Sequence, residues 1–326
     1  MLSEESLELI VQDHLAELEW QAGHGPDFAP GSGERDTWND IVLRGRLRNA
    51  VRNLNPDVPE EYLDQAIGEV ITPKSQSAIA ENRRIHQILV EGYRGIEYID
   101  HEGNVQNPTI YFLSSQPHKN DYLSLNQVTV ANLDGERRFD VVCYVNGMPL
   151  AFIELKKTGA NTSVEGAHNQ LQTYVKEFGM AFRFANIVIP SDDLSAKYGT
   201  PFTPWNHFAP WNVDEDGSPV DPNNMVVAGE PVTQLDLLLD GLFNVERFGQ
   251  LYSDFTAFDD TAEGLVMRIA KPHQYFAVTK AVGSTITAAR GDKRAGVIWH
   301  TTGAGKSMEM ELYTAKIMRR PEIISP

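Results

Sequence analysis

Two acidic residues and a lysine lie at the open end of a predicted β-hairpin. Apolar runs flank the pair Asn146-Gly147, and an Asn-Gly pair between apolar runs is a strong signal for a two-residue hairpin turn. Glu154 and Lys156 are two positions apart, so they share one face of their strand. The hairpin can bring Asp140 beside them, because the start of its first strand lies next to the end of its second.

These residue types suit a magnesium site. Two carboxylates, Asp140 and Glu154, and the carbonyl oxygen of Leu155 form a set of hard oxygen ligands that fits Mg²⁺. A bound metal ion lowers the pKa of its water and stabilises charge on a phosphoryl oxygen, and Lys156 could add to that stabilisation. Glu154 follows an apolar run, where a carboxylate is costly unless paired or metal-bound. The alternative is a surface hairpin ending in solvated charges.

A second group of residues that could take part in chemistry lies near residue 300. An apolar segment, 295–299, leads into Gly303-Ala304-Gly305-Lys306-Ser307 and then into a predicted helix, which is the context that a phosphate-binding loop requires. Backbone N–H groups at the start of the helix would cradle phosphates. Lys306 would reach the β- and γ-phosphates of ATP, and Ser307 would hold Mg²⁺. The alternative is a glycine-rich turn with a chance lysine.

The elements that must position these residues follow from hydrophobic period and turn signals. The predicted organisation is α/β, with a helical N-terminal part, a strand-rich middle and a C-terminal part beginning near residue 260. Residues 191–230 are mostly irregular, and a break is expected near Gly241. Helices are expected over 3–20, 36–54, 59–70, 75–92, 164–178, 232–257, 272–290 and 305–319, and strands within 95–155 and over 184–190 and 295–299.

Composition narrows the class of protein. The chain has 326 residues with 41% apolar residues, which suits a soluble protein of about two domains. No apolar run is long enough to span a membrane, and the charged N-terminus is not a secretory signal. The single cysteine, Cys143, excludes a disulfide within the chain. These features predict a protein of the reducing cytoplasm that does not bind membranes.

The net charge of −17 is unusual for a protein that binds DNA, because DNA affinity usually depends on lysines and arginines. Local patterning matters more than the sum. Arg44, Arg48 and Arg52 are spaced to share one helix face, although such a face is more often simply solvated. Further basic candidates are Arg46, Arg83, Arg84, Lys156 and Lys157. Partner subunits could supply much of the DNA affinity of so acidic a chain.

The hairpin resembles the PD-(D/E)xK nuclease core, with Asp140, Glu154 and Lys156 at the family's positions. The predicted helix after it carries Gln170 and Tyr174, which match the Q-x-x-x-Y element of the nucleases in type I restriction motor subunits. These two residues lie one helical turn apart and could reach the site or the DNA backbone, although helix-surface hydrogen bonding is the simpler interpretation.

The resemblance also implies an acidic residue on the first helix near the metal. Glu8 is the candidate. Its competitors are Glu4, Glu5 and Asp13.

The phosphate loop resembles that of helicase-like motors of superfamily 2. His300 stands where the general phosphate-loop pattern has glycine, and such motors tolerate this difference. Upstream, Gln274 matches the adenine-contacting glutamine of these motors. The resemblance implies the start of a RecA-like motor domain over 259–326 after an endonuclease domain over 1–258.

The chain as a whole resembles the N-terminal part of the restriction (R) subunit of type I restriction–modification enzymes. This implies cleavage of double-stranded DNA, ATP-driven DNA translocation in the full protein, and assembly with methylation and specificity subunits. About twenty residues follow Lys306, too few for the second acidic motif that ATP hydrolysis needs. We expect a fragment that binds nucleotide weakly and does not hydrolyse ATP by itself.

Two other interpretations stay open. One is a single-chain restriction enzyme that joins a nuclease, a helicase and a methyltransferase. The other is a module that uses the nuclease fold only to bind DNA or a partner.

Overall fold

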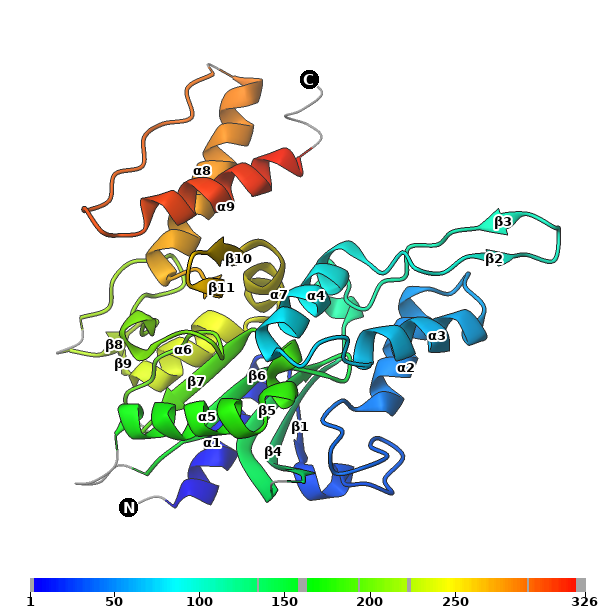
Figure 1. Cartoon of the computed structure of the whole chain (residues 1–326). Coiled ribbons are helices and arrows are strands. Elements are labelled where there is room, and N and C mark those ends of the chain that lie inside the picture. Colours follow the sequence, from blue (N-terminus) through cyan, green and yellow to red (C-terminus); the bar gives the residue numbers. More distant parts are fainter. Residues whose placement is uncertain are drawn as a thin grey trace.

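The computed structural model describes residues 3–133, 135–157, 163–192, 194–221, 224–291 and 293–320. It is a mixed α/β structure in which helices flank one central sheet (Figure 1). Its helices are α1 (Glu4–Glu17), α2 (Arg44–Leu54), α3 (Glu60–Ile71), α4 (Ala78–Glu91), α5 (Val164–Glu177), α6 (Gln234–Phe243), α7 (Val245–Asp254), α8 (Pro272–Arg290) and α9 (Lys306–Met318). Its strands are β1 (Gln21–His24), β2 (Tyr98–Ile99), β3 (Val105–Gln106), β4 (Tyr122–Asn132), β5 (Gly135–Val145), β6 (Met148–Leu155), β7 (Ile187–Ser191), β8 (Val226–Val227), β9 (Glu230–Pro231), β10 (Thr256–Thr261) and β11 (Gly264–Ile269).

The central sheet has the strand order β1-β4-β5-β6-β7. The central strand β5 is antiparallel to both of its neighbours, β4 and β6, while the outer strands β1 and β7 run parallel to β4 and β6 respectively. The middle of the sheet contains the predicted hairpin, because β5 and β6 are joined at Asn146-Gly147. Both turn residues have positive φ, +52° and +78°, as a tight hairpin turn requires.

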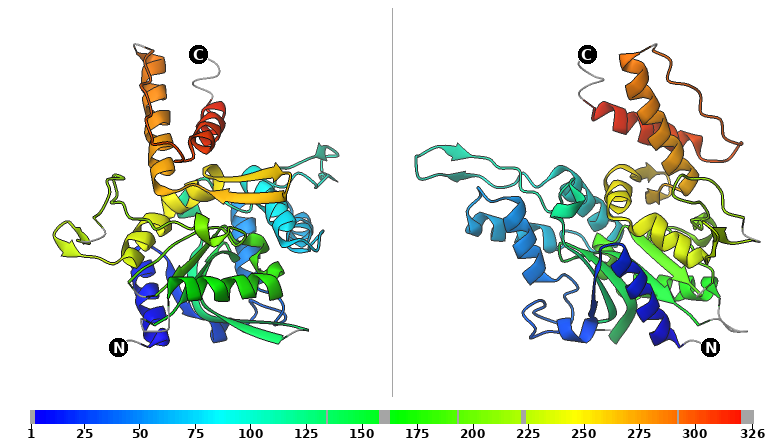
Figure 2. Two further views of the ribbon diagram at one scale, coloured as in Figure 1. Left: turned by 60° about the vertical axis from the view of Figure 1, so that its left-hand side comes forward. Right: turned by 180° about the vertical axis from the view of Figure 1, so that it is seen from behind.

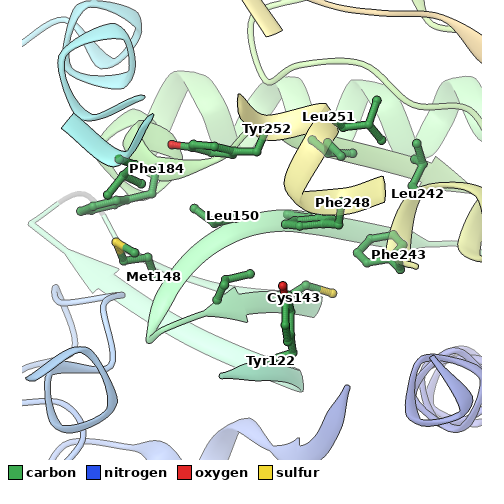
Figure 3. Close-up of a cluster of buried hydrophobic side chains, with 14 of the residues drawn as sticks. Tyr122, Cys143, Met148, Leu150, Phe184, Leu242, Phe243, Phe248, Leu251 and Tyr252 are labelled. Atoms are coloured by element: carbon green, nitrogen blue, oxygen red, sulfur yellow. The ribbon is translucent and has the colours of Figure 1, made fainter. Parts of the chain in front are cut away.

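The two faces of the sheet are covered by different helices (Figures 1 and 2). Helix α5 packs against one face, where Leu171 and Tyr174 join a buried cluster with Phe139 and Phe152. Helices α1, α6 and α7 lie over the other face. Figure 3 shows part of the cluster there, in which side chains of α7 such as Phe248 pack on the strands. The two helix layers therefore hold β5 and β6 from both sides.

An ion pair ties α1 to α6. The ring of His14 lies 2.7 Å from Asp240 and 3.6 Å from Asp236. Hydrogen bonds to Asp236 and Asp240 raise the pKa of His14 to about 9, against the opposing effect of burial. The imidazole is therefore charged at neutral pH and joins the two helices electrostatically.

Two predicted elements differ from the structure. The helix expected over 36–54 begins only at Arg44, and residues 36–43 are irregular. The strand expected over 295–299 is irregular, with Val297 94% and Trp299 82% exposed. A strand is stabilised by its ladder partners, and no strand of the described residues lies beside this segment. The apolar run was therefore a misleading signal for burial.

Helices α8 and α9 pack together at the end of the molecule farthest from the N-terminus (Figure 2). Asp254 at the end of α7 holds α9, because its two oxygens accept from Lys316 at 2.7 Å and Arg319 at 3.0 Å.

The domain boundary expected at residue 258 lies inside β10 and stays a prediction. None of the helices in the described ranges is sufficiently long and apolar to cross a membrane.

Candidate functional site

The sheet register places the two predicted carboxylates opposite each other. Val141 pairs with Ile153, so Asp140 and Glu154 face each other one position further along the same two strands. The Oδ2 atom of Asp140 accepts a hydrogen bond from the Leu155 backbone N–H at 2.7 Å. The ammonium of Lys156 donates to Glu154 Oε1 at 3.0 Å. The structure thus brings the three hairpin residues together, as predicted.

Glu154 is held in an environment that opposes its charge. Its side chain is 1% exposed, and its Oε2 atom has no hydrogen-bond partner among the described residues. Burial and the nearby charge of Asp140 raise the pKa of Glu154 to about 8, and Lys156 offsets this only in part. Burial also raises the pKa of Asp140, despite the Leu155 N–H and Lys156. The protein therefore leaves negative charge at this point incompletely compensated.

Glu8 is the first-helix acid that faces the pair. It is 3% exposed and accepts from Asn126 Nδ2 at 3.3 Å. Burial and the charge of Asp140 raise the pKa of Glu8 to about 7. Glu5 and Asp13 are exposed, which separates them from the site. Glu4 is partly buried, and its charge contributes to the raised pKa of Asp140 and Glu154, so it lies at the margin of the same group.

Helix α5 brings the two remaining predicted residues to the same site. Gln170 Nε2 donates a hydrogen bond to the hydroxyl of Tyr174. Burial raises the pKa of Tyr174, and the charges of Glu154 and Asp140 raise it further. Tyr174 therefore lies within electrostatic range of both carboxylates, and Gln170 is its direct partner.

The donor set fits a magnesium ion that keeps part of its water shell. Among the described residues, no three His, Cys, Asp or Glu side chains form a group that could enclose a metal by themselves. Asp140 and Glu154 would hold the ion. Glu154 Oε2 has no hydrogen-bond partner among the described residues, so it could serve as a metal ligand. The Leu155 carbonyl accepts from Lys156 at 3.3 Å. Two carboxylates with waters are the usual Mg²⁺ arrangement.

The phosphate loop also brings its predicted residues together. Gly303 and Gly305 have φ values of +84° and +80°, which glycine adopts most readily. Gln274 Nε2 donates to the carbonyls of Ala304 and Gly305, both at 3.3 Å. The ammonium of Lys306 donates to backbone carbonyls of its own loop at 2.9 and 3.2 Å. A phosphate would replace these carbonyls as the partner of Lys306.

Ser307 is exposed in the first turn of α9. His300, the departure from the glycine pattern, pairs with the buried Glu309 of that helix at 2.7 Å. This pair gives the departure a structural role, since it fixes the loop to the helix that follows. The pairing of His300 with Glu309 was not predicted, because no spacing rule for phosphate loops includes Glu309.

Comparison with known proteins gives two family matches. Residues 1–207 match the family described as type I restriction enzyme R protein N terminus. Residues 273–325 match the SWI2/SNF2 ATPase family.

Curated relatives include the Type I restriction enzyme HindI endonuclease subunit of Haemophilus influenzae, 31% identical over 100% of this chain and 31% of the relative. The putative type I restriction enzyme MjaIXP endonuclease subunit of Methanocaldococcus jannaschii is 29% identical over 96% of this chain and 31% of the relative. The Type I restriction enzyme EcoprrI endonuclease subunit of Escherichia coli is 26% identical over 49% of this chain and 50% of the relative. The chain spans 31% of the length of the first two relatives.

Proposed function

Because the chain belongs to the family of type I restriction enzyme R proteins, which its residues 1–207 match, we propose that it supplies the DNA-cleaving site of such an enzyme. The site is a PD-(D/E)xK core that hydrolyses phosphodiester bonds of double-stranded DNA with Mg²⁺. The observation that carries the proposal is the buried carboxylate of Glu154, with one unpartnered oxygen beside Asp140. Replacing such a buried charged group with an apolar side chain often leaves the folded state equally stable or more stable, so stability alone does not explain its presence.

Each residue has a role in this proposal that follows from its position. Asp140 and Glu154 bind the metal, which when bound activates water and stabilises phosphoryl charge. Lys156, 3.0 Å from Glu154, carries the positive charge that stabilises the negative phosphoryl oxygens. Gln170 and Tyr174 form a hydrogen-bonded pair and present an amide and a hydroxyl to the DNA backbone.

The C-terminal part has a separate role in the complete R protein. We propose that residues 259–326 begin a helicase-like motor domain that binds ATP, in line with the SWI2/SNF2 ATPase match. Gln274 would contact the adenine, and Lys306 and Ser307 the phosphates and their Mg²⁺. The complete protein would translocate DNA and assemble with methylation and specificity subunits in the cytoplasm.

The decisive experiment uses the complete R protein in its complex. We expect Asp140→Asn and Lys156→Ala to reduce double-strand cleavage by at least about a hundred-fold, since each removes a charge that acts on the transition state. ATP-driven translocation should be unchanged. Lys74→Ala is the matched control, because the side chain of Lys74 forms a surface ion pair with Glu69. Cleavage that survives in both site variants would refute the catalytic assignment and favour a DNA-binding or partner-binding module.

A further inference from the structure

Two consecutive side chains of β4 reach the same carboxyl group. Asn126 Nδ2 donates to Glu8 Oε2 at 3.3 Å, and the side-chain amide of Gln127 lies near enough to Glu8 to lower the pKa of that carboxyl. Neighbouring residues of a regular strand point to opposite faces of the sheet. The backbone must therefore depart from regular strand geometry at this point.

That departure lies at Gln127, which has a φ of +52°. The ladder between β4 and β5 pairs Asn126 with Val141 and Val128 with Phe139, and it omits the pair between Gln127 and Asp140. The irregularity therefore falls directly opposite the catalytic aspartate. Residues held in sparsely populated φ regions such as this one cluster at active sites.

A glycine on a neighbouring segment accommodates the irregular backbone. A Cβ atom at Gly25 would lie 2.6 Å from the carbonyl oxygens of both Asn126 and Gln127. Only glycine allows the chain to pass so close. The break is thus supported by long-range packing, which is what a strained conformation needs in order to persist.

The amide of Asn126 has a fixed orientation. Its Oδ1 atom lies 2.8 Å from His24 Nδ1, and His24 is its register partner on β1. Because Nδ2 of Asn126 donates to Glu8, Oδ1 must accept, so His24 carries its proton on Nδ1. Asn126 and Glu8 are both buried, so water has little access to the bond between them. The two hydrogen bonds therefore run in one direction: His24 donates to Asn126, and Asn126 donates to Glu8.

We propose that Asn126 and Gln127 are positioning residues that hold Glu8 toward Asp140 and Glu154. The proposal rests on the proposed function of that site. Glu8 is buried near Asp140, and two like charges would separate unless the Glu8 carboxylate were held by donors. Two side-chain amides supply neutral donors, which restrain it without cancelling its charge. Glu8 is thereby placed to bind the water shell that Mg²⁺ retains.

The test separates the Gln127 side chain from its backbone. Gln127→Gly accommodates the positive φ while it removes the whole side chain, amide included. Ala228→Gly is the matched control, since Ala228 also has a φ of +52° and lies in the β8–β9 turn, away from the site. Mn²⁺ affinity of the chain is measured by calorimetry, together with the thermal midpoint without metal. We expect Gln127→Gly and Asn126→Ala each to weaken Mn²⁺ binding about ten-fold. The metal-free midpoint of Gln127→Gly should not fall, and the control should bind Mn²⁺ as the native chain does.

A double-mutant cycle shows whether the effect passes through Glu8. In a Glu8→Gln background, Gln127→Gly should cause no further loss of Mn²⁺ affinity. In the assembled enzyme, kcat should fall while KM for DNA is unchanged. Equal losses in both backgrounds, or no loss in the native background, would overturn the inference alone. A native chain that binds no Mn²⁺, or an Asp140→Asn enzyme that still cleaves, would overturn the proposed function with it.

Discussion

Replacing Glu154 by glutamine should stabilise the metal-free protein while abolishing cleavage. Glutamine keeps the shape of the side chain, and its amide oxygen can still accept from Lys156, 3.0 Å away in the native protein. What it removes is a buried carboxyl beside Asp140 that is costly to ionise. The two effects have one cause, because the charge that destabilises the empty site is the charge that would bind the metal.

The magnitude follows from the pKa of Glu154, which rises from 4.5 to about 8 on folding. A carboxyl with a raised pKa destabilises the folded state. The effect is absent below pH 4.5 and grows until pH exceeds the folded value. The cost grows by roughly 1.4 kcal/mol for each pH unit between 4.5 and 7, which corresponds to about 3.5 kcal/mol at pH 7. This is an upper limit, because Lys156 loses its charged partner in the variant.

The assay is thermal unfolding of the native chain and of Glu154→Gln, at pH 7 with a chelator and again with Mn²⁺. Without metal, the variant should unfold at a midpoint several degrees higher. Mn²⁺ should raise the midpoint of the native chain only, since a ligand stabilises the state that binds it.

Glu81→Gln is the matched control. Glu81 is also 1% exposed, but the pKa of Glu81 is lowered, because hydrogen bonds led by those from Arg84 outweigh burial. Its Arg84 partner is 2.7 Å away. Glu81→Gln should therefore lower the midpoint. If Glu154→Gln also lowers it, Glu154 is a structural ion-pair partner and the reasoning fails.

Two further predictions concern the helices around the site. Asp236 and Asp240 raise the pKa of His14 to about 9. The stabilisation that this ion pair gives is therefore complete below pH 6.5 and is lost as pH rises through 9. His14→Gln should flatten the pH dependence of unfolding between these values, and an unaltered pH profile would contradict the assignment. Asp254→Asn should increase proteolysis at α9, because the charged partner of Lys316 at 2.7 Å is removed; equal cleavage rates would contradict it.

Local chemistry allowed the hairpin and its three residues to be predicted from sequence. The Asn146-Gly147 turn fixes the register of β5 and β6, and register alone puts Asp140 opposite Glu154. The same applies to α5, where period and spacing place Gln170 and Tyr174 one turn apart. Prediction failed at 295–299 because this apolar segment has no neighbouring strand among the described residues to pair with. It failed at 36–43 because Ile41, Val42 and Leu43 are buried in the core from an irregular segment, so their burial does not require a helix.

The supporting residues of the site could not have been found in this way. Gln127 reaches Glu8 because of a positive φ in β4, and that φ depends on the close passage of Gly25. Gln127 and Gly25 are about a hundred positions apart in sequence, and nothing in their local sequences signals the contact. Asn126 likewise requires the parallel pairing of β1 with β4, which brings His24 beside it. Sequence reasoning reached the residues of the site itself, but not the contacts that orient Glu8.

The arginines of this strongly negative chain do not supply the positive charge that the proposed DNA-cleaving site would need, because they are engaged in ion pairs. Arg44, Arg48 and Arg52, the basic helix face, pair with acidic residues of neighbouring segments. Arg46, Arg83 and Arg84 are paired as well. Arginines that are already paired with carboxylates are poorly disposed to neutralise phosphates.

At the proposed nuclease site, by contrast, acidic side chains outnumber basic ones. Burial raises the pKa of Asp140, Glu154 and Glu8, and the charge of Asp140 raises the pKa of the other two further, while Lys156 offsets this only in part at Asp140 and Glu154. DNA phosphates would be repelled from such a group unless a divalent cation lay between them. The metal would therefore serve as the electrostatic bridge that lets an acidic protein hold its substrate, in addition to any part in the chemistry. Affinity for DNA at this site should accordingly depend on the metal rather than on a basic surface.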